Sequence, residues 1–408
     1  MHGGVWISVW RPNRTGDATL HAPSVLHKVL VRACPGMHAA RRQALVVSVA
    51  AAITGARLTV TASGRAMDSS AAVKHGIKRA DRLLSNPHLQ HERRGVYLAL
   101  AHALVGGTTR PVVIVDGSPV DEAGVHFLLR ASAPVGGRAV TLSEEVHTLA
   151  RREKPKTHAR FLARLQVVTD AGFRTPWFKQ VERWGWDWVG RMRHRHLVQF
   201  EVAGEWLPAK ALYAKATRGP QALGRVRLTQ SRPIDCELVL YRGKAKGRVK
   251  KTRSGQRSRS AHSQKQAARS REPWLLATSL PAHSKRAKQG VRLYVLRMQG
   301  EEAFRDLKSS RFGLSFEQSR TGDLERLQLL LLIAALAMLV LWLLGKAAEL
   351  TQQHRAYQPN TVRHRAVLST LFLGLQVVND RRVALTTPHL LAAAQMLMAT
   401  IRAQATDY

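Results

Sequence analysis

The sequence RPVVIVDGS, residues 110–118, decides the fold class. Its run of β-branched residues predicts a buried strand, and the Asp-Gly that follows predicts a turn at the carboxyl end of that strand. The stretch HFLLRASAPVGGRAVTLSEEVH (126–147) predicts two further strands joined as a hairpin at Gly136-Gly137. The central part of the chain therefore begins with successive strands.

Downstream of this hairpin, helices alternate with strands. KTHARFLARL (156–165) and TPWFKQVERWG (175–185) have apolar residues at helical spacing. QVVTDAGF (166–173) and WDWVGRMR (186–193) have strand character. Strands followed by this alternation predict an α/β layer architecture.

The charge balance predicts a polyanionic partner. The 408-residue chain has 64 Lys and Arg against 27 Asp and Glu, a formal net charge of +37. Nucleic acid is the favoured partner because neutralised phosphates release counterions, although ribosomal and membrane-surface proteins are also basic.

Cys34 and Cys236 have no metal-ligand spacing and the N-terminus has no signal-peptide pattern, so a reducing cytoplasm is expected.

A basic helix is predicted in the N-terminal part of the chain. TASGRAM predicts a short helix, and Asp68 or Ser69 is the expected N-cap of the helix that follows. One face of that second helix suits the phosphate backbone or major groove of DNA, although a solvated charged face is the simpler interpretation. Its basic residues are Lys74, His75, Lys78, Arg79 and Arg82.

Two segments have an extreme composition. Leu329–Leu344 is an unbroken run of 16 apolar residues. A membrane span needs about 20, so we predict a buried core helix rather than a membrane span. Residues 243–271 contain eleven Lys or Arg and no acid, which predicts a loop without fixed structure that either stays solvated or folds onto DNA.

The domain organisation is predicted from these changes in composition and pattern along the chain. Short strand-like pieces (LPAKALY, GRVRLTQ and CELVLYR) predict a β insertion, EPWLLATSLP (272–281) returns to strand character, and the remainder is helical at about 284–310, 324–350 and 360–405. The predicted segments are a loose tail (1–24), a helical DNA-binding domain (25–107), a first part of the core (108–200), the β-rich insertion with its basic loop (201–271), a second part of the core (272–345) and a helical C-terminal region (346–408).

Two aspartates end apolar strands. Asp116 (VDGS) and Asp170 (TDAG) are each followed by small residues that let a ligand come close. Ligands of α/β sheets bind at such strand ends. Each aspartate, taken alone, is better explained as a turn former than as a catalytic residue.

A polar stripe on the helix LYVLRMQGEEAFRDLKSS supplies a third carboxylate. At about 100° per residue, one narrow stripe contains Tyr294, Arg297, Glu301 and Lys308. Glu301 lies about 40° from Arg297, whereas the neighbouring Glu302 lies about 140° away. The pattern therefore selects Glu301, although a surface row of salt bridges is the alternative.

Three carboxylates beside phosphate-binding groups suit a divalent metal site. Carboxylate oxygens are hard ligands that suit Mg²⁺ or Mn²⁺. Two such ions close together activate a nucleophile and stabilise the leaving oxygen of an in-line displacement at phosphorus. The Arg, Tyr and Lys side chains of the stripe would hold DNA phosphates in register.

The spacing Y-x2-R-x3-E-x6-K resembles the signature of bacterial insertion-sequence transposases of the IS-four family; here it is formed by Tyr294, Arg297, Glu301 and Lys308. The words VDGS, TDAGF, EPWLLATSLP, RMQGEEAFRDLKSSRFGL and IKRADRLLSNPHL are most similar to those in transposases of tetracycline-resistance transposons. The similarity extends from about residue 25 to the C-terminus. It implies a DDE catalytic core with an RNase H-like mixed sheet, interrupted by the β-rich insertion.

The resemblance also implies a reaction. Asp116, Asp170 and Glu301 would form a catalytic triad that binds two Mg²⁺ or Mn²⁺ ions. Cut-and-paste transposition would then proceed by a nick, a DNA hairpin, reopening of the hairpin and joining of the 3′-hydroxyl to target DNA. Trp274 matches a tryptophan that stacks on a flipped base in the hairpin, although a role in the strand core is the alternative.

The implied partners are double-stranded DNA, as the element's terminal inverted repeats and as target, and a second copy of the chain in a synaptic homodimer. A cytoplasmic, nucleoid-associated protein without a membrane is expected. Two other functions stay open: an RNase H-like metal-dependent DNA nuclease without strand transfer, and a basic DNA-binding regulator without catalysis.

Overall fold

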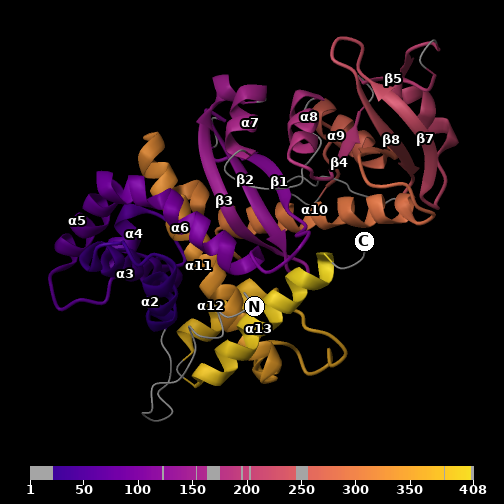
Figure 1. Ribbon diagram of the computed structural model, residues 1–408. Helices are drawn as coiled ribbons and strands as arrows, with labels where there is room; N and C mark the ends of the chain where they lie inside the picture. Colours follow the sequence, from indigo (N-terminus) through magenta and orange to yellow (C-terminus); the bar gives the residue numbers. More distant parts are fainter. Residues whose placement is uncertain are drawn as a thin grey trace. The chain divides into compact units, whose positions relative to one another are not determined.

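The computed structural model describes residues 22–121, 124–152, 154–162, 175–193, 196–201, 204–244, 256–380 and 382–405 (Figure 1). The chain divides into two compact units. Unit 1 comprises Met1–Arg152 and Met298–Tyr408, and unit 2 comprises Glu153–Arg297. Helix α10 (Arg286–Lys308) crosses this boundary, so each unit contains one part of it.

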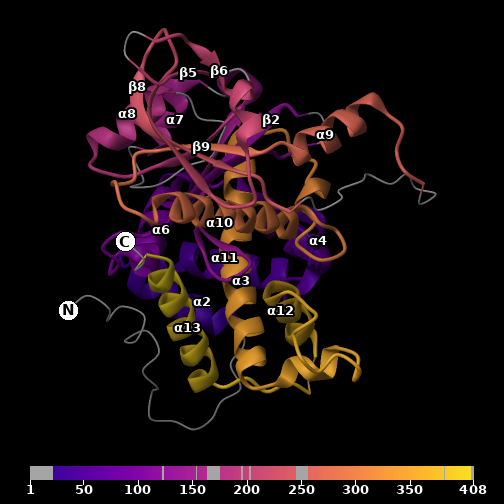
Figure 2. The ribbon, with the colours of Figure 1, turned by 90° about the vertical axis from the view of Figure 1, so that its right-hand side faces the viewer.

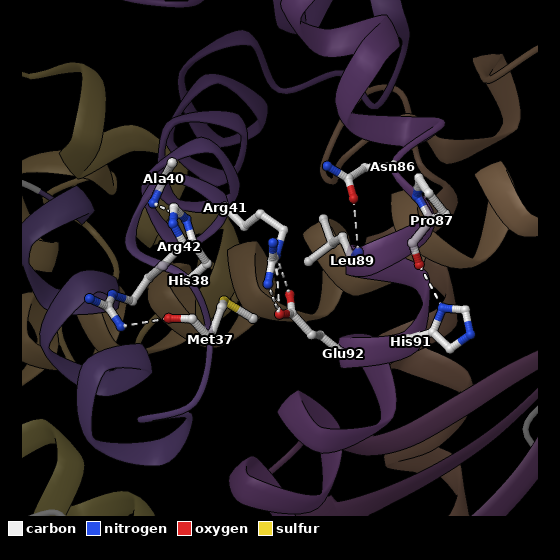
Figure 3. Close-up of polar contacts among 10 residues, drawn as sticks. All are labelled: Met37, His38, Ala40, Arg41, Arg42, Asn86, Pro87, Leu89, His91 and Glu92. Carbon is white, nitrogen blue, oxygen red and sulfur yellow. Dashed lines mark hydrogen bonds and ion pairs between the residues drawn. The ribbon is translucent and has the colours of Figure 1, made fainter.

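The N-terminal part of unit 1 is helical. Its helices are α2 (Ala22–Ala33), α3 (Ala39–Gly55), α4 (Val60–Arg65), α5 (Val73–Leu84) and α6 (Pro87–Val105). Helix α2 begins inside the segment predicted as a tail, because the apolar residues Leu26 and Leu30 are one turn apart and fully buried. An ion pair between Arg41 and Glu92 joins α3 to α6, and the Asn86 side chain caps α6 (Figure 3).

The predicted N-cap of α5 is wrong. Helix α5 begins after Ala72, which provides no side-chain cap. The Ser69 hydroxyl instead accepts a hydrogen bond from the Ala71 N–H at 3.2 Å, within the connection that precedes the helix. The helix just before this connection, α4, does have a side-chain cap: the Thr59 hydroxyl accepts from the Ala62 N–H at 3.1 Å.

Helices α4 and α5 touch through their backbones. A Cβ atom on Gly76 would lie 2.3 Å from the Gly64 carbonyl oxygen, and a Cβ atom on Gly64 would lie 2.4 Å from the Ile77 Cα. Only glycine at both positions allows this approach, which orients α5 with Ala80, Leu83 and Leu84 inward.

The sheet of unit 1 is an antiparallel meander in the order β1-β2-β3. Its strands are β1 (Ile114–Pro119), β2 (His126–Pro134) and β3 (Ala139–Thr148). The predicted hairpin is confirmed: Gly136 and Gly137 connect β2 to β3 with φ values of +80° and +89°, which other residues adopt only with strain. The first strand begins at Ile114, later than predicted, and the turn predicted at Asp116-Gly117 is wrong, because both residues pair with β2 and the strand continues to Pro119.

Helix α11 (Leu324–Leu350) forms the core of unit 1. It packs against α3, α6 and β3, and against α12 (Thr370–Asn379) and α13 (Thr387–Ala405), which flank it in Figure 2. Its length and composition would allow a membrane span, but 94% of its most apolar 18-residue stretch is buried inside the structure. The prediction of a buried core helix over Leu329–Leu344 is confirmed. The short 3-10 helices of unit 1 are η1 (Leu149–Arg151), η3 (Phe316–Gln318) and η4 (Gln353–Tyr357).

Unit 2 contains a six-stranded antiparallel sheet in the order β4-β9-β8-β7-β5-β6. Its strands are β4 (Val189–Met192), β5 (Leu197–Gln199), β6 (Leu207–Pro208), β7 (Gln221–Leu228), β8 (Ile234–Tyr241) and β9 (Trp274–Thr278). Strands β4 and β9 were expected in the core with β1–β3, but they pair with the strands of the predicted insertion. The reason is that β9 is central, with Leu275, Leu276 and Ala277 all fully buried between two neighbouring strands.

The remaining elements of unit 2 are α7 (Pro155–Leu162), α8 (Thr175–Arg183), η2 (Ala209–Lys215) and α9 (Ala261–Arg271). LPAKALY, predicted as a strand, is mostly the 3-10 helix η2. The last part of the basic segment is helical because AHSQKQAARSR is rich in good helix formers.

The predicted strand 166–173, with Asp170, lies outside the described residues. Every strand pair in the described part of the chain is antiparallel, so the fold shown is a mixed α/β architecture with antiparallel sheets. The mixed character of the core sheet and the RNase H-like topology stay predictions, as do the six domain boundaries.

Candidate active site

Asp116 lies near the middle of β1, after a buried run. Val113 and Val115 are almost inaccessible, whereas Asp116 is half-buried. The N–H of Gly117 donates to Asp116 Oδ1 at 2.8 Å. A Cβ atom on Gly117 would lie 2.4 Å from the ring of Phe127, so a larger residue next to the carboxylate would have to displace this ring.

The face of β1 that contains Asp116 is turned toward α10. Ile114 contacts Gly300, where a Cβ atom would lie 3.2 Å from Ile114 Cγ2, and Ser118 Oγ accepts a hydrogen bond from Lys308 Nζ at 2.9 Å. Side chains two residues apart in a strand share one face. Asp116, midway between Ile114 and Ser118, therefore faces α10.

The two contacts also give the alignment of β1 with α10. Four strand residues span about 13 Å and eight helix residues span about 12 Å, so the two elements run side by side in the same direction between the contacts. Asp116 consequently lies beside the stretch of α10 between Gly300 and Lys308, which begins with Glu301.

The carboxylates of α10 divide between two faces. Glu301 lies about 20° around the helix from Lys308, whereas Glu302 lies about 120° away. Glu302 is engaged elsewhere, 2.6 Å from Arg305 and 3.9 Å from Arg138. Arg138 also pairs with the buried Asp306. These contacts support the selection of Glu301, because they place its neighbours on a different side of the helix.

Lys308 is held at the end of β1. Its ammonium group donates to Ser118 Oγ and to the carbonyl oxygen of Pro119. Burial lowers the pKa of Lys308 below its usual value; the carboxylates of Glu317 and Asp121 partly oppose this effect, and the charge of Arg130 adds to it. The positive charge is thereby fixed beside the strand that carries Asp116.

The two candidate metal ligands that the structure describes, Asp116 and Glu301, suit a hard divalent cation. Asp116 and Glu301 offer carboxylate oxygens, which are ligands that Mg²⁺ prefers. No cluster of three or more His, Cys, Asp or Glu side chains that could hold a metal ion occurs within the described ranges, and Asp170, the third predicted ligand, lies outside them.

A comparison with known families identifies the chain. Residues 93–338, more than half of its length, match the family model described as the transposase DDE domain. The chain belongs to this DDE transposase family. The matched segment runs from α6 into α11 and includes Asp116, Asp170 and Glu301. No curated protein matches the transposase.

In unit 2 of the transposase, α10 carries an aromatic cluster. The rings of Trp274 and Tyr294 lie 4.8 Å apart edge to face, and Tyr241 lies 5.8 Å from Trp274 on β9. The Arg297 guanidinium lies 5.5 Å from the centre of the Tyr294 ring. Tyr294 is 5% exposed and Trp274 is half-buried, so their packing role is visible here, and their DNA contacts stay predictions.

The basic face of α5 in the transposase is exposed. Gly76, Ala80, Leu83 and Leu84 are buried on the opposite side of the helix. Asp81, the one acid on this helix, pairs with Arg326 of α11. The exposed basic residues are Lys74, His75, Lys78, Arg79 and Arg82.

The sequence pattern did not single out a buried charged pair beside the site. Arg130 on β2 and Glu144 on β3 are each 2% exposed and form an ion pair of 2.7 Å. The available signal was their position, because the two lie at nearly equal distances from the Gly136-Gly137 turn and are therefore expected to pair across the hairpin.

Proposed function

We propose that the transposase catalyses cut-and-paste transposition of an insertion sequence, with Asp116, Asp170 and Glu301 as the ligands of two Mg²⁺ or Mn²⁺ ions. One observation carries the proposal. β1 turns the face with Asp116 toward the stretch of α10 between Gly300 and Lys308, which includes Glu301, and Lys308 donates a hydrogen bond to Ser118 of the same strand.

The bound ions would supply activation of a water or 3′-hydroxyl nucleophile and stabilisation of the leaving oxygen. The carboxylates of the chain would position these groups in line at the scissile phosphate. Nicking, hairpin formation, hairpin opening and joining to target DNA are all in-line displacements at phosphorus. One set of side chains can therefore serve each step in turn.

Other residues would hold the DNA. Lys308 would present its ammonium to a phosphate near the cut. Arg297, which lies earlier in α10 on the same face of the helix, would bind another phosphate with its guanidinium. Tyr294 packs against both Arg297 and Trp274 and so orients them, in addition to its proposed DNA contact. Trp274 would stack on the base expelled when the hairpin forms.

The α5 face is expected to bind the terminal repeats through phosphates. Replacing Lys78 and Arg79 with Ala should weaken binding to all duplex sequences and lower the slope of log affinity against log salt by about 1 per lost phosphate contact. Fluorescence anisotropy across a salt series measures this slope. Arg382→Ala is the control, because Arg382 is exposed but paired with Asp380 at 2.7 Å; an equal loss there would refute a specific role for α5.

A strand-transfer assay tests the proposed reaction. A pre-cut element end with a free 3′-hydroxyl, incubated with target DNA and Mg²⁺, is expected to be joined to the target. Removal of the metal with a chelator should abolish joining and leave end binding intact. Nicking without joining would favour the nuclease, and binding without either reaction would favour the regulator.

Two chains per joined pair of ends, measured by light scattering, are expected for the synaptic homodimer.

A further inference from the structure

A fully buried polar network spans β2, β3 and α6 in unit 1. Arg130 Nε donates to Glu144 Oε2 at 2.7 Å, and Arg130 Nη2 lies 2.7 Å from the same oxygen. The Tyr97 hydroxyl donates to the other oxygen, Oε1, at 2.8 Å. Burial, followed by the nearby Glu144 charge, raises the pKa of Tyr97 well above its usual value, so the hydroxyl remains a donor.

Arg130 and Glu144 of this network lie in one cross-strand row with Asp116. Asp116 lies directly opposite Arg130, and Arg130 lies directly opposite Glu144. Residues directly opposite each other in an antiparallel sheet share one face. The Phe304 ring of α10 packs 4.9 Å from the Arg130 guanidinium, so the row Asp116-Arg130-Glu144 faces the helix that carries Glu301.

One edge of the Arg130 guanidinium has no partner. Nε and Nη2 form the edge that faces Glu144 on β3, and Nη1 lies on the opposite edge. Nη1 and Nη2 are both buried and make no hydrogen bond to any residue that the structure describes, but Nη2 lies in the ion pair with Glu144, so Nη1 is the one of the two without a carboxylate beside it. Since β2 lies between β3 and β1, Nη1 is expected to be directed to the side of β1 and Asp116. A buried donor without a partner calls for an explanation, and functional use is one.

We propose that Arg130 is a positioning residue for Asp116, an inference that rests on the proposed metal-binding function. Nη1 donates to the Asp116 oxygen that points away from the metal, once the carboxylate takes its ligating orientation. Glu144 balances the charge of Arg130, which limits repulsion of the cation, and Tyr97 fixes Glu144. Outer hydrogen bonds of this kind orient ligating carboxylates and tune metal affinity.

Mn²⁺ binding to the full-length protein, followed by electron paramagnetic resonance without DNA, tests this role. The variant Arg130→Gln/Glu144→Gln removes the pair without leaving a buried charge, and is expected to weaken Mn²⁺ binding about 10- to 100-fold. The matched control Arg138→Gln/Asp306→Asn removes another partly buried ion pair of unit 1 and is expected to bind Mn²⁺ like the wild type.

Arg130→Lys provides a second variant if the double variant does not fold. It keeps a positive charge beside Glu144 and removes Nη1, so the same loss of Mn²⁺ affinity is expected. Unchanged affinity in a folded Arg130 variant, or an equal loss in the Arg138/Asp306 control, would overturn the positioning role. Asp116→Asn separates the two proposals: if it binds Mn²⁺ as well as the wild type, the metal site itself is refuted.

Discussion

Glu301→Gln is expected to reduce DNA strand cleavage by about a thousand-fold, while Glu302→Gln cleaves at nearly the wild-type rate. Loss of a metal ligand removes several kcal/mol of transition-state stabilisation, and about 4 kcal/mol corresponds to a factor of a thousand in rate. Glu301 shares the face of α10 from which Lys308 contacts β1. Glu302 instead pairs with Arg305 and lies 3.9 Å from Arg138.

The measurement is nicking of a labelled duplex that carries the inverted repeats flanking the reading frame, with Mg²⁺ at a fixed concentration. The two substitutions are chemically identical and adjacent, so each controls for the other. Thermal unfolding confirms that both variants are folded. Equal loss of cleavage in the two variants, or a larger loss for Glu302→Gln, would contradict the assignment of the third ligand.

Gly345→Ala is expected to destabilise unit 1 by about 3 kcal/mol or more, at the upper end of overpacking effects. Its Cβ atom would lie 1.8 Å from the carbonyl oxygen of Thr370, a clash with backbone that no side-chain rotation relieves. Gly374 makes the reciprocal contact, since its Cβ atom would lie 2.1 Å from the Leu341 carbonyl oxygen. Helices α11 and α12 can therefore cross at this distance only through two glycines.

Urea denaturation measures the loss, and Gly95→Ala is the matched control. Gly95 is exposed in the interior of α6, and a Cβ atom there meets nothing within 4 Å. The control is expected to gain about 0.5–1 kcal/mol of stability, because alanine loses less backbone entropy in a helix. A Gly345→Ala variant as stable as the wild type would show that α12 can move away from α11 without loss.

The buried pair of Arg130 and Glu144 shows where sequence reasoning reaches its limit. The strand pattern predicted the β2–β3 hairpin, and the helical repeat predicted that Glu301 and Lys308 share a face. Neither pattern states what lies across the sheet from Asp116. That depends on the register of three strands and on the packing of Phe304 and Tyr97 from two helices.

The sequence by itself determined the features that depend on neighbours along the chain: the turn at Gly136-Gly137, the buried helix at Leu329–Leu344, and the spacing of Glu301 and Lys308 on α10. Only the tertiary structure decided that β4 and β9 pair with β8, that glycines join α4 to α5, and that Ser69 does not cap α5. A run of apolar residues is equally compatible with any sheet that buries it, because hydrophobic burial is not directional. The choice between sheets therefore came from contacts between residues far apart in the sequence.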